Sequence, residues 1–208
     1  EPLSTDEWAQ DGRIVLHVLV EGRVAGALAL ADEVRPAARE AIEALHRLGI
    51  ETAMLTGDAH NVAEAVGREL GIDRIEAQVR PEEKSARVRQ LEEQGKKVAM
   101  VGDGVNDAAA LASADLGIAM GSGTDAAIEA ADITVMRDDL LAVADALRLA
   151  RKTLRTIKMN LFWAFLYNVL GIPVAALGLL NPMIAGGAMA ASSVLVVLNS
   201  LRLTRYAR

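Results

Sequence analysis

The chain lacks cysteine altogether, and over one long stretch it also lacks charge. Without cysteine no disulfide can form within the chain. From Met159 to Leu201 there is no charged side chain, and this stretch is long enough for two membrane-spanning helices of roughly 20 residues each. Acids are absent from residues 151 to 208, where Arg and Lys flank the uncharged stretch. The sequence therefore predicts a water-soluble part followed by a membrane part.

The charge of the two parts differs in sign. All 28 acidic side chains lie in residues 1 to 150. A strongly acidic surface repels phosphate backbones, so we expect no nucleic-acid partner. In the membrane part, basic residues lie at both outer ends of the uncharged stretch and none lies at the Asn181-Pro182 turn in its middle. This asymmetry predicts that both ends of the pair of spans are cytoplasmic and that the lipid bilayer surrounds the spans.

The start of the chain suggests a larger protein. It opens with Glu1 rather than Met, has no signal peptide, and begins in what reads as the middle of a domain. We therefore expect a fragment of a longer polypeptide.

Apolar runs of strand length alternate with helical patterns through the soluble part. A strand, turn, strand unit is expected over Ile14–Val20 and Val24–Leu30, and a helix follows Pro36. Five further strands are expected, each separated from the next by a helix: residues 51–55, 75–79, 98–102, 116–120 and 133–136. This alternation predicts an α/β fold with a doubly wound parallel sheet. A long helix from Leu140 is then expected to enter the bilayer.

Two kinds of side chain with metal-binding capacity receive structural interpretations here. His17 lies in the first predicted strand without another His or Cys in register, which favours a strand residue over a metal ligand. Met54, Met100, Met120 and Met136 fall at strand ends, where we expect them to pack in the core.

The run Val98–Gly102 followed by Asp103 is the most informative stretch. Gly102 and Gly104 allow a tight turn around Asp103, and Asp107 begins the next helical pattern. Two carboxylates thus meet at the rim beyond the carboxyl ends of the strands, where α/β sheets bind ligands. Paired oxygen ligands with room for water suit Mg²⁺. The alternative is a turn with a helix cap, in which Asp is equally common.

A second strand ends in the same way, at Thr56-Gly57-Asp58. A hydroxyl and backbone amides before a helix favour a phosphate, although Thr56 and Asp58 can also be simple capping residues. Lys84 lies in the first turn of a helix that begins at Pro81, where the helix dipole disfavours a cation. Lys84 therefore either extends into solvent or reaches an anion in front of the helix.

Taken together, Thr56-Gly57-Asp58, Lys84 and the run from Gly102 to Asp107 resemble the phosphorylation domain of P-type cation-transporting ATPases, which has a haloacid-dehalogenase-like fold. The resemblance extends over residues 24 to 203, and Asp32–Pro36 is similar to the hinge motif of that family. Residues 1–23 resemble the end of a nucleotide-binding domain, 24–150 a phosphorylation domain without its nucleophile strand, and 151–208 a stalk with a two-helix transmembrane hairpin. The hairpin resembles the last two helices of the heavy-metal branch, particularly the copper exporters.

The resemblance implies phosphoryl transfer from ATP to an aspartate, hydrolysis of the acyl phosphate, and coupling to ion export across, we expect, the plasma membrane. Thr56 and the Gly57 amide would hold phosphoryl oxygens and Lys84 would offset their charge. The resemblance further implies that Asp103 binds Mg²⁺, while Asn106 and Asp107 order the site. Asp58 completes the Thr-Gly-Asp motif.

Two motifs of the family are missing from this chain, and their absence leaves alternative functions to consider. The nucleophile motif Asp-Lys-Thr-Gly-Thr and the metal-binding Cys-Pro-Cys motif are both absent from the 208 residues, so this chain alone is expected to be inactive toward ATP. Its partner would be the missing amino-terminal part of the same pump. A membrane-anchored phosphatase is disfavoured because Asp32 lacks a second Asp two residues on, where Val34 stands. A non-catalytic partner of an intact pump is the third hypothesis.

Polar residues inside the apolar spans indicate the transported ion. The first span contains Tyr167 and Asn168, and the second contains Met189, Ser192 and Ser193, which helical spacing places near one face. The alternative is helix packing through small residues. Packing does not need a methionine, whose soft thioether suits monovalent copper and offers zinc little.

Neither span contains Asp, Glu or Lys, so neither supplies the charge expected for zinc or cadmium. Tyr-Asn and Met-Ala-Ala-Ser-Ser also resemble the transport motifs of the copper branch. We therefore predict monovalent copper, with silver as a mimic, ahead of zinc.

Overall fold

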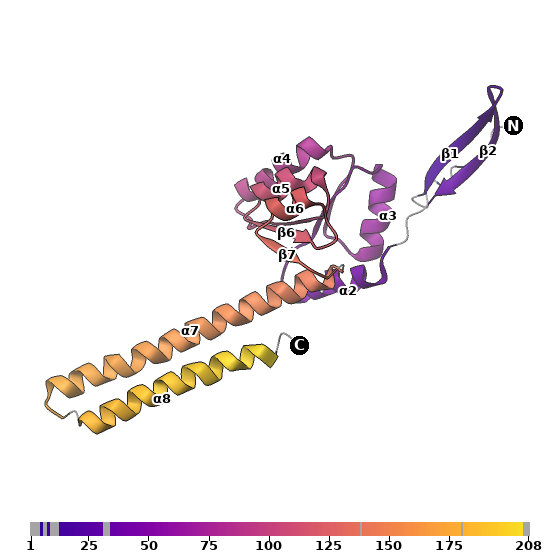
Figure 1. The fold of residues 1–208 in the computed structure, drawn as a ribbon. Coiled ribbons are helices and arrows are strands. Elements are labelled where there is room, and N and C mark those ends of the chain that lie inside the picture. Colours follow the sequence, from indigo (N-terminus) through magenta and orange to yellow (C-terminus); the bar gives the residue numbers. More distant parts are fainter. Residues whose placement is uncertain are drawn as a thin grey trace. The chain divides into compact units, whose positions relative to one another are not determined.

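The computed structural model describes residues 5, 8, 13–30, 34–137, 139–179 and 181–205. Its chain divides into two compact units, Glu1–Ala144 and Asp145–Arg208, and each is described by itself (Figure 1). The predicted hinge motif Asp32–Pro36 lies partly outside the described residues, as does most of the segment before Arg13.

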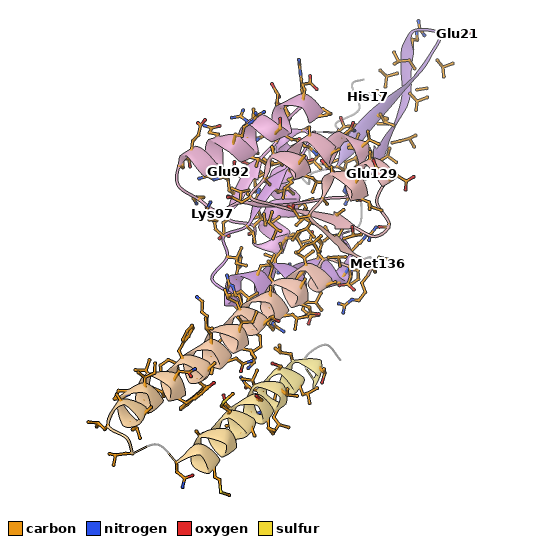
Figure 2. All side chains as sticks on the ribbon, turned by 60° about the vertical axis from the view of Figure 1, so that its left-hand side comes forward. His17, Glu21, Glu92, Lys97, Glu129 and Met136 are labelled. Carbon is orange, nitrogen blue, oxygen red and sulfur yellow. The ribbon has the colours of Figure 1, made fainter. Side chains whose placement is uncertain are left out.

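The first unit begins with an antiparallel hairpin of β1 (Ile14–Val20) and β2 (Arg23–Leu30). Glu21 and Gly22 make the turn that was expected between these strands, and both have positive φ. His17 lies within β1 (Figure 2), and the described residues hold no group of three His, Cys, Asp or Glu side chains suited to a metal. Apolar side chains on both faces of the hairpin remain exposed, including Leu16, Leu19 and Leu28.

The remainder of this unit alternates strands and helices. Its elements are α2 (Pro36–Arg47), β3 (Ala53–Leu55), α3 (His60–Leu70), β4 (Arg74–Glu76), α4 (Pro81–Glu93), β5 (Ala99–Gly102), η1 (Val105–Asp107), α5 (Ala108–Ser113), β6 (Leu116–Met120), α6 (Asp125–Ala130) and β7 (Ile133–Val135). Every pairing among these strands is parallel, which confirms the predicted α/β class. Helical connections of this length are what parallel pairing requires.

The parallel strands form two sheets rather than one. β3 pairs with β4, while β5, β6 and β7 pair in that order. Among the described residues, β3 and β5 therefore each have a strand partner on one side only. Thr56 follows the carboxyl end of β3 and Asp103 follows that of β5, so both predicted motifs lie directly after parallel strands.

The core of this unit forms where helices cover β6. Ile118, Leu111 and Val88 are the largest fully buried side chains, and they come from β6, α5 and α4. α4 packs against α5, and α5 packs against β6. Small residues such as Ala110, Ala119 and Ala127 are buried between these elements, which lets them approach closely. One expectation was wrong: Met136, predicted to be a core residue, is 84% exposed because the chain leaves the sheet at β7 (Figure 2).

Two long helices follow, α7 (Leu141–Ala176) and α8 (Pro182–Leu201), and a short 3₁₀ turn, η2 (Arg202–Arg205), succeeds α8. Both predicted spans are long and apolar enough to cross a membrane, with mean hydropathy of 1.4 in α7 and 1.3 over Ala185–Thr204. Asn181 caps α8 by accepting from the Met183 amide at 2.9 Å, which accounts for the helix start at Pro182. Pro173 lies inside α7 without ending it.

Candidate functional site

Lys84 and Asp107 form the central ion pair of the candidate site. The Lys84 ammonium donates to Asp107 Oδ1 at 2.7 Å, and the two side chains are only 17% and 12% exposed. Lys84 lies in the first turn of α4, where the helix dipole opposes a cation unless an anion is near. Asp107 supplies that anion from η1, which packs against α4. Of the two sequence interpretations of Lys84, the structure supports the one in which it reaches an anion.

Gly102 makes room for Asp107. A Cβ on Gly102 would lie 2.7 Å from Asp107 Cβ, 2.9 Å from its Oδ2 and 3.0 Å from its Cγ. Only a glycine therefore lets the Asp107 side chain lie directly against the end of β5. The Asp107 amide donates to the Gly104 carbonyl at 3.0 Å, which closes the turn that brings η1 back to the strand.

Asp103 is held through its backbone, while its side chain is exposed. The Thr124 amide donates to the Asp103 carbonyl at 2.8 Å, and a Cβ on Gly123 would lie 2.8 Å from that same oxygen. The loop after β6 therefore fixes the backbone of Asp103, a role that sequence reasoning missed although the Gly121-Ser122-Gly123-Thr124 run was its signal. Asn106 is likewise exposed.

These residues fit Mg²⁺ in part. The ion prefers one or two carboxylates together with water and phosphate oxygens, and the exposed carboxylate of Asp103 at the strand end meets that need. Asp107 was predicted as a second Mg²⁺ ligand, but its Oδ1 already accepts from Lys84. Asp107 therefore anchors the lysine through Oδ1, and its role as a Mg²⁺ ligand stays a prediction together with that of Asp103.

Thr56 and Asp58 bind each other in a tight turn after β3. The Thr56 hydroxyl donates to Asp58 Oδ2 at 2.6 Å and accepts from the Asp58 amide at 3.1 Å. The Thr56 backbone is fixed as well, because its amide donates to Glu76 and its carbonyl accepts from Val79. Asp58 and Gly57 are exposed. The turn that the sequence predicted is therefore present, with the hydroxyl engaged by the carboxylate.

The structure forms the two halves of the predicted site but does not join them. Among the described residues, no hydrogen bond or ion pair links Thr56 or Asp58 to Lys84, Asp103 or Asp107. The separation follows from the sheet, because β3 and β5 belong to different sheets.

A cluster of hydrogen bonds among Asp73, Thr52 and His46, here called a brace, fixes the start of β3. The sequence did not predict it. Asp73 Oδ2 accepts from the Thr52 amide at 2.7 Å and from the Thr52 hydroxyl at 3.0 Å, and it lies 3.0 Å from His46 Nε2. These bonds to Thr52, assisted by His46, hold the pKa of Asp73 below its usual value. The brace connects the end of α2 and the loop before β4 to the strand that carries Thr56.

A similar brace lies at the start of β5. Asp115 accepts from the Lys97 ammonium at 2.7 Å and from the Val98 amide at 3.1 Å, and its own amide donates to Glu92. The Lys97 ammonium and the Val98 amide lower the pKa of Asp115, and the same carboxylate raises the pKa of Lys97. Both strands that end at the candidate site are therefore fixed at their other ends.

In the second unit, the predicted ion-binding residues differ in how far they are buried. Tyr167 and Ser192 are half-buried, whereas Asn168, Met189 and Ser193 are exposed, Met189 at 60%. Asn168 Nδ2 donates to the Ala164 carbonyl at 2.8 Å, and the Ser193 hydroxyl donates to the Met189 carbonyl at 3.2 Å. Both polar groups are therefore bonded to their own helix.

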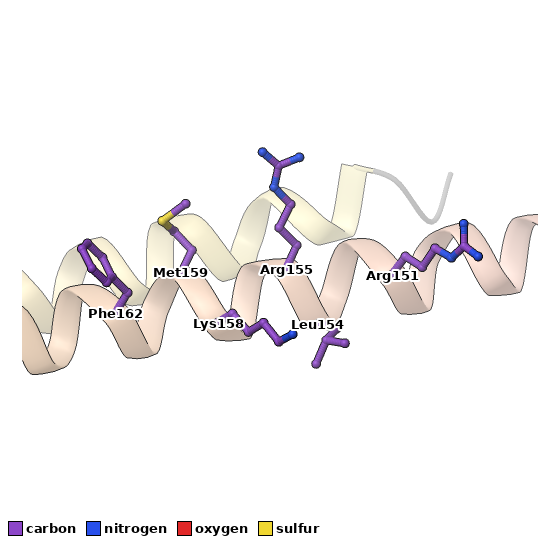
Figure 3. A pocket seen from close by; sticks show the side chains of 6 residues that line it. All are labelled: Arg151, Leu154, Arg155, Lys158, Met159 and Phe162. Atoms are coloured by element: carbon purple, nitrogen blue, oxygen red, sulfur yellow. The ribbon is translucent and has the colours of Figure 1, made fainter. Parts of the chain in front are cut away.

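A shallow groove of about 600 Å³ along α7 marks the change from charged to apolar surface. Arg151, Arg155 and Lys158 line it together with Leu154, Met159 and Phe162 (Figure 3). The Lys158 side chain runs back toward Leu154, away from the apolar part of the helix (Figure 3). This direction is typical of a lysine that keeps its charge at a membrane boundary.

Comparison with known proteins places this geometry in a family. A model of the haloacid dehalogenase-like hydrolases matches residues 3–115, and a second model with the same description matches residues 85–147. The chain belongs to the haloacid dehalogenase-like hydrolase family. Its parallel strands, with Thr56 and Asp103 following two of them, are the features that the family resemblance predicted.

Within this family the similarity is to P-type ATPases of the heavy-metal branch, as the motifs indicated. The chain is 54% identical over 198 residues to the copper-exporting P-type ATPases of Staphylococcus aureus strains JH9 and Newman. The match covers 95% of this chain but 25% of each relative, so the chain spans about a quarter of their length.

Solved structures agree on the fold. A crystal structure of a zinc-transporting PIB-type ATPase in its E2.Pi state matches with a TM-score of 0.84 and 38% identity, over 95% of this chain and 32% of that one. The catalytic domain of the CPx-ATPase CopB-B matches with a TM-score of 0.52 and 35% identity, over 62% of this chain and 51% of that one. The predicted haloacid-dehalogenase-like domain followed by two long apolar helices is thereby confirmed.

Proposed function

We propose that this chain is part of an ATP-driven transporter of monovalent copper that works through an aspartyl-phosphate intermediate. The nucleophilic aspartate would lie outside residues 1–208. The observation that carries the proposal is the Lys84–Asp107 pair beside Asp103 at the end of β5, in a chain that is 54% identical to copper-exporting ATPases. ATP is the proposed phosphoryl donor.

The roles of the residues follow from the charge of the reaction. The carboxylate of the nucleophile attacks the γ-phosphorus of ATP, the bond to the bridging oxygen breaks, and ADP departs with that bond's electron pair. Lys84, held by Asp107, would offset the charge on the transferred group. Thr56 and the Gly57 amide would bind its oxygens once the hydroxyl turns from Asp58. Mg²⁺, held by Asp103 together with Asp107, would supply further positive charge to the phosphate oxygens.

The sheet arrangement supports a missing nucleophile strand. β3 and β5 each have one edge without a strand partner among the described residues, and their carboxyl ends carry the two halves of the site. A parallel strand that paired with both edges would join the sheets and bring Thr56 toward Asp103. Its own carboxyl end would then lie between them, where a nucleophile is needed. This supports residues 24–150 as a phosphorylation domain without that strand. Residues 1–23 stay proposed as the end of a nucleotide-binding domain, although β1 pairs with β2 across that boundary.

The choice of copper over zinc rests on the residues of the spans. Met189 offers a thioether, which suits a soft monovalent ion, and neither span carries an acid for a divalent one. The relatives named above as copper exporters are 54% identical, against 38% for the zinc-transporting structure. A zinc or cadmium pump remains the second candidate because that zinc-transporting structure matches the same 95% of the chain.

The test of ion identity uses the complete transporter. Phosphoenzyme formation from ATP should depend on monovalent copper or silver, and Met189→Ala should raise the copper concentration needed for half-maximal formation. Met183→Ala is the matched control, because Met183 is 86% exposed in the first turn of α8 and outside the predicted ion site. The assignment of copper would be excluded if phosphoenzyme formation depended on zinc rather than copper. It would also be excluded if Met189→Ala left the copper dependence unchanged.

The metal role of Asp103 has a separate test. In the complete transporter, Asp103→Ala should abolish or greatly weaken the dependence of phosphoenzyme formation on Mg²⁺. An unchanged Mg²⁺ titration would show that Asp103 is not the ligand. The isolated 208-residue chain should neither form a phosphoenzyme nor hydrolyse ATP, and turnover by it would favour the phosphatase alternative. If the chain did not co-purify with any amino-terminal part of the pump, the hypothesis of a non-catalytic partner of an intact pump would be favoured.

The proposed location is the plasma membrane, with α7 and α8 as two of several spans. The soluble unit and both ends of the hairpin would be cytoplasmic. Support comes from Arg151, Lys152, Arg155 and Lys158 on the approach to the first span and from Arg202 after the second. Cysteines introduced at Lys158 and Asn181 should react with impermeant reagents from opposite sides of the membrane.

A further inference from the structure

A three-residue polar cluster connects α7 to α8, outside the residues predicted to bind the ion. Asn160 Nδ2 donates to Ser200 Oγ at 3.1 Å, and Asn199 Nδ2 donates to Asn160 Oδ1 at 2.7 Å. A single asparagine thus uses both ends of its amide to contact the other helix. Neither Asn168 nor Ser193 makes such a connection, since each is bonded to its own helix.

The cluster lies on the same helix faces as part of the candidate ion site. Tyr167 is seven residues beyond Asn160, and Ser192 is seven residues before Asn199. Seven residues are close to two turns, so each pair shares one side of its helix. Burial agrees with this geometry, because Asn160, Tyr167, Ser192 and Asn199 are all half-buried on helices that are otherwise largely exposed.

The cluster also sets which residues lie level with one another. The two helices run in opposite directions, so equal steps from the cluster reach equal depths. Seven steps along α7 reach Tyr167, and seven back from Asn199 along α8 reach Ser192, both about 10 Å from the cluster. A slip by one turn would move these partners apart by about 5 Å. Apolar contacts between two helices in lipid oppose a shift of one helix along the other only weakly. Paired amides fix the alignment of the two helices, because a shift breaks their hydrogen bonds.

We propose that Asn160, together with Asn199 and Ser200, is a positioning cluster that holds Tyr167 level with Ser192 and thereby sets the geometry of the ion site. The inference rests on the proposed function only for the meaning of the ion site. The register itself is a property of the two helices. Asn160 does not touch the ion in this account.

The first experiment measures which positions of α7 and α8 lie level with each other, and it needs no metal. In the complete transporter with its other cysteines replaced, Tyr167→Cys and Ser192→Cys should be joined by a short bifunctional thiol cross-linker, with the product identified by mass spectrometry. The offset pair Gly171→Cys and Ser192→Cys, one turn deeper on α7, should cross-link far less. Adding Asn160→Leu, which keeps the bulk and removes both hydrogen bonds, should reduce this preference by several-fold.

The second experiment reads the consequence for the ion. Asn160→Leu should raise the copper concentration for half-maximal phosphoenzyme formation by about threefold to tenfold, since each of the two interhelical hydrogen bonds that it removes changes an equilibrium by roughly threefold on average. Phosphoenzyme formation from inorganic phosphate should be unchanged. Asn199→Leu removes one of these two bonds and should have a smaller effect, and the double variant should be no worse than Asn160→Leu alone. Thr204→Val is the control, because that hydroxyl bonds only the Leu201 carbonyl within its own segment.

Each outcome decides the proposal. A cross-linking preference that survives Asn160→Leu would overturn it, whether or not copper dependence changed, because Asn160 would then act by another route. A lost preference with unchanged copper dependence would also overturn it. If phosphoenzyme formation depends on zinc instead, the copper assignment fails, while the cross-linking preference and the zinc titration of Asn160→Leu still test the cluster.

Discussion

Gly102→Ala is the substitution whose effect the structure predicts most directly. The new Cβ would lie 2.7 Å from Asp107 Cβ and 2.9 Å from Asp107 Oδ2, closer than side chains tolerate. Asp107 must therefore move, and its 2.7 Å bond to Lys84 stretches or breaks. Overpacking of this kind costs about 1–3 kcal/mol. For a chain of this size that lowers the thermal midpoint by roughly 2–12 °C.

The assay combines thermal unfolding of the chain in detergent with phosphoenzyme formation by the complete transporter. Gly102→Ala should lower both the midpoint and the level of phosphoenzyme, because a displaced Asp107 no longer holds Lys84. Gly104→Ala is the matched control two residues on: its nearest contact would be Asp107 Oδ2 at 3.7 Å, an ordinary van der Waals distance, and its φ of −106° suits any residue. Equal effects of the two substitutions would refute the claim that close contact with Asp107 is the reason for Gly102.

Three further predictions concern the soluble unit. Lys84→Met should reduce phosphoenzyme formation more than Asp58→Asn does, and should lower stability by about 1–3 kcal/mol because Asp107 is left buried without its partner; equal activity of both variants in a phosphorylation assay would contradict this role. Asp73→Asn should cost stability at neutral pH and progressively less as pH falls below about 4, because the pKa of Asp73 is lowered on folding and its contribution is lost as pH falls through that lowered value. If the difference in free energy of unfolding between the unsubstituted protein and Asp73→Asn did not change as pH falls, the bonds from Thr52 and His46 would contribute nothing. Thr124→Val should weaken Mg²⁺ dependence less than Asp103→Ala, since only the Thr124 amide contacts Asp103.

Local sequence patterns were sufficient for the elements of this protein. The glycine after β5, the proline that begins α4 and the uncharged run after Met159 each act over a few residues, through allowed backbone angles, the missing proline amide or the cost of charge in lipid. Such effects do not depend on distant parts of the chain. The alternating strands and helices, the α/β class and the two long apolar helices could all be predicted for that reason.

Contacts between elements were not visible in those patterns. Lys84 and Asp107 are separated by 23 positions, and only the packing of η1 against α4 shows that the lysine has a buried partner. The same packing gives Asp107 Oδ1 a hydrogen bond from the lysine that the sequence did not show. Met136 was predicted to be buried from its place at a strand end, but burial depends on what covers the strand end.

The residues that connect distant segments show the same limit. Asn160 and Asn199 were not singled out from the sequence, where they lie 39 positions apart. Only the antiparallel course of α7 and α8 brings the two amides within hydrogen-bonding distance. The sequence alone determined which segments are strands, helices and spans, since those depend on neighbouring residues. The tertiary structure decided which charged and polar groups meet, because their separation in space depends on how the whole chain packs.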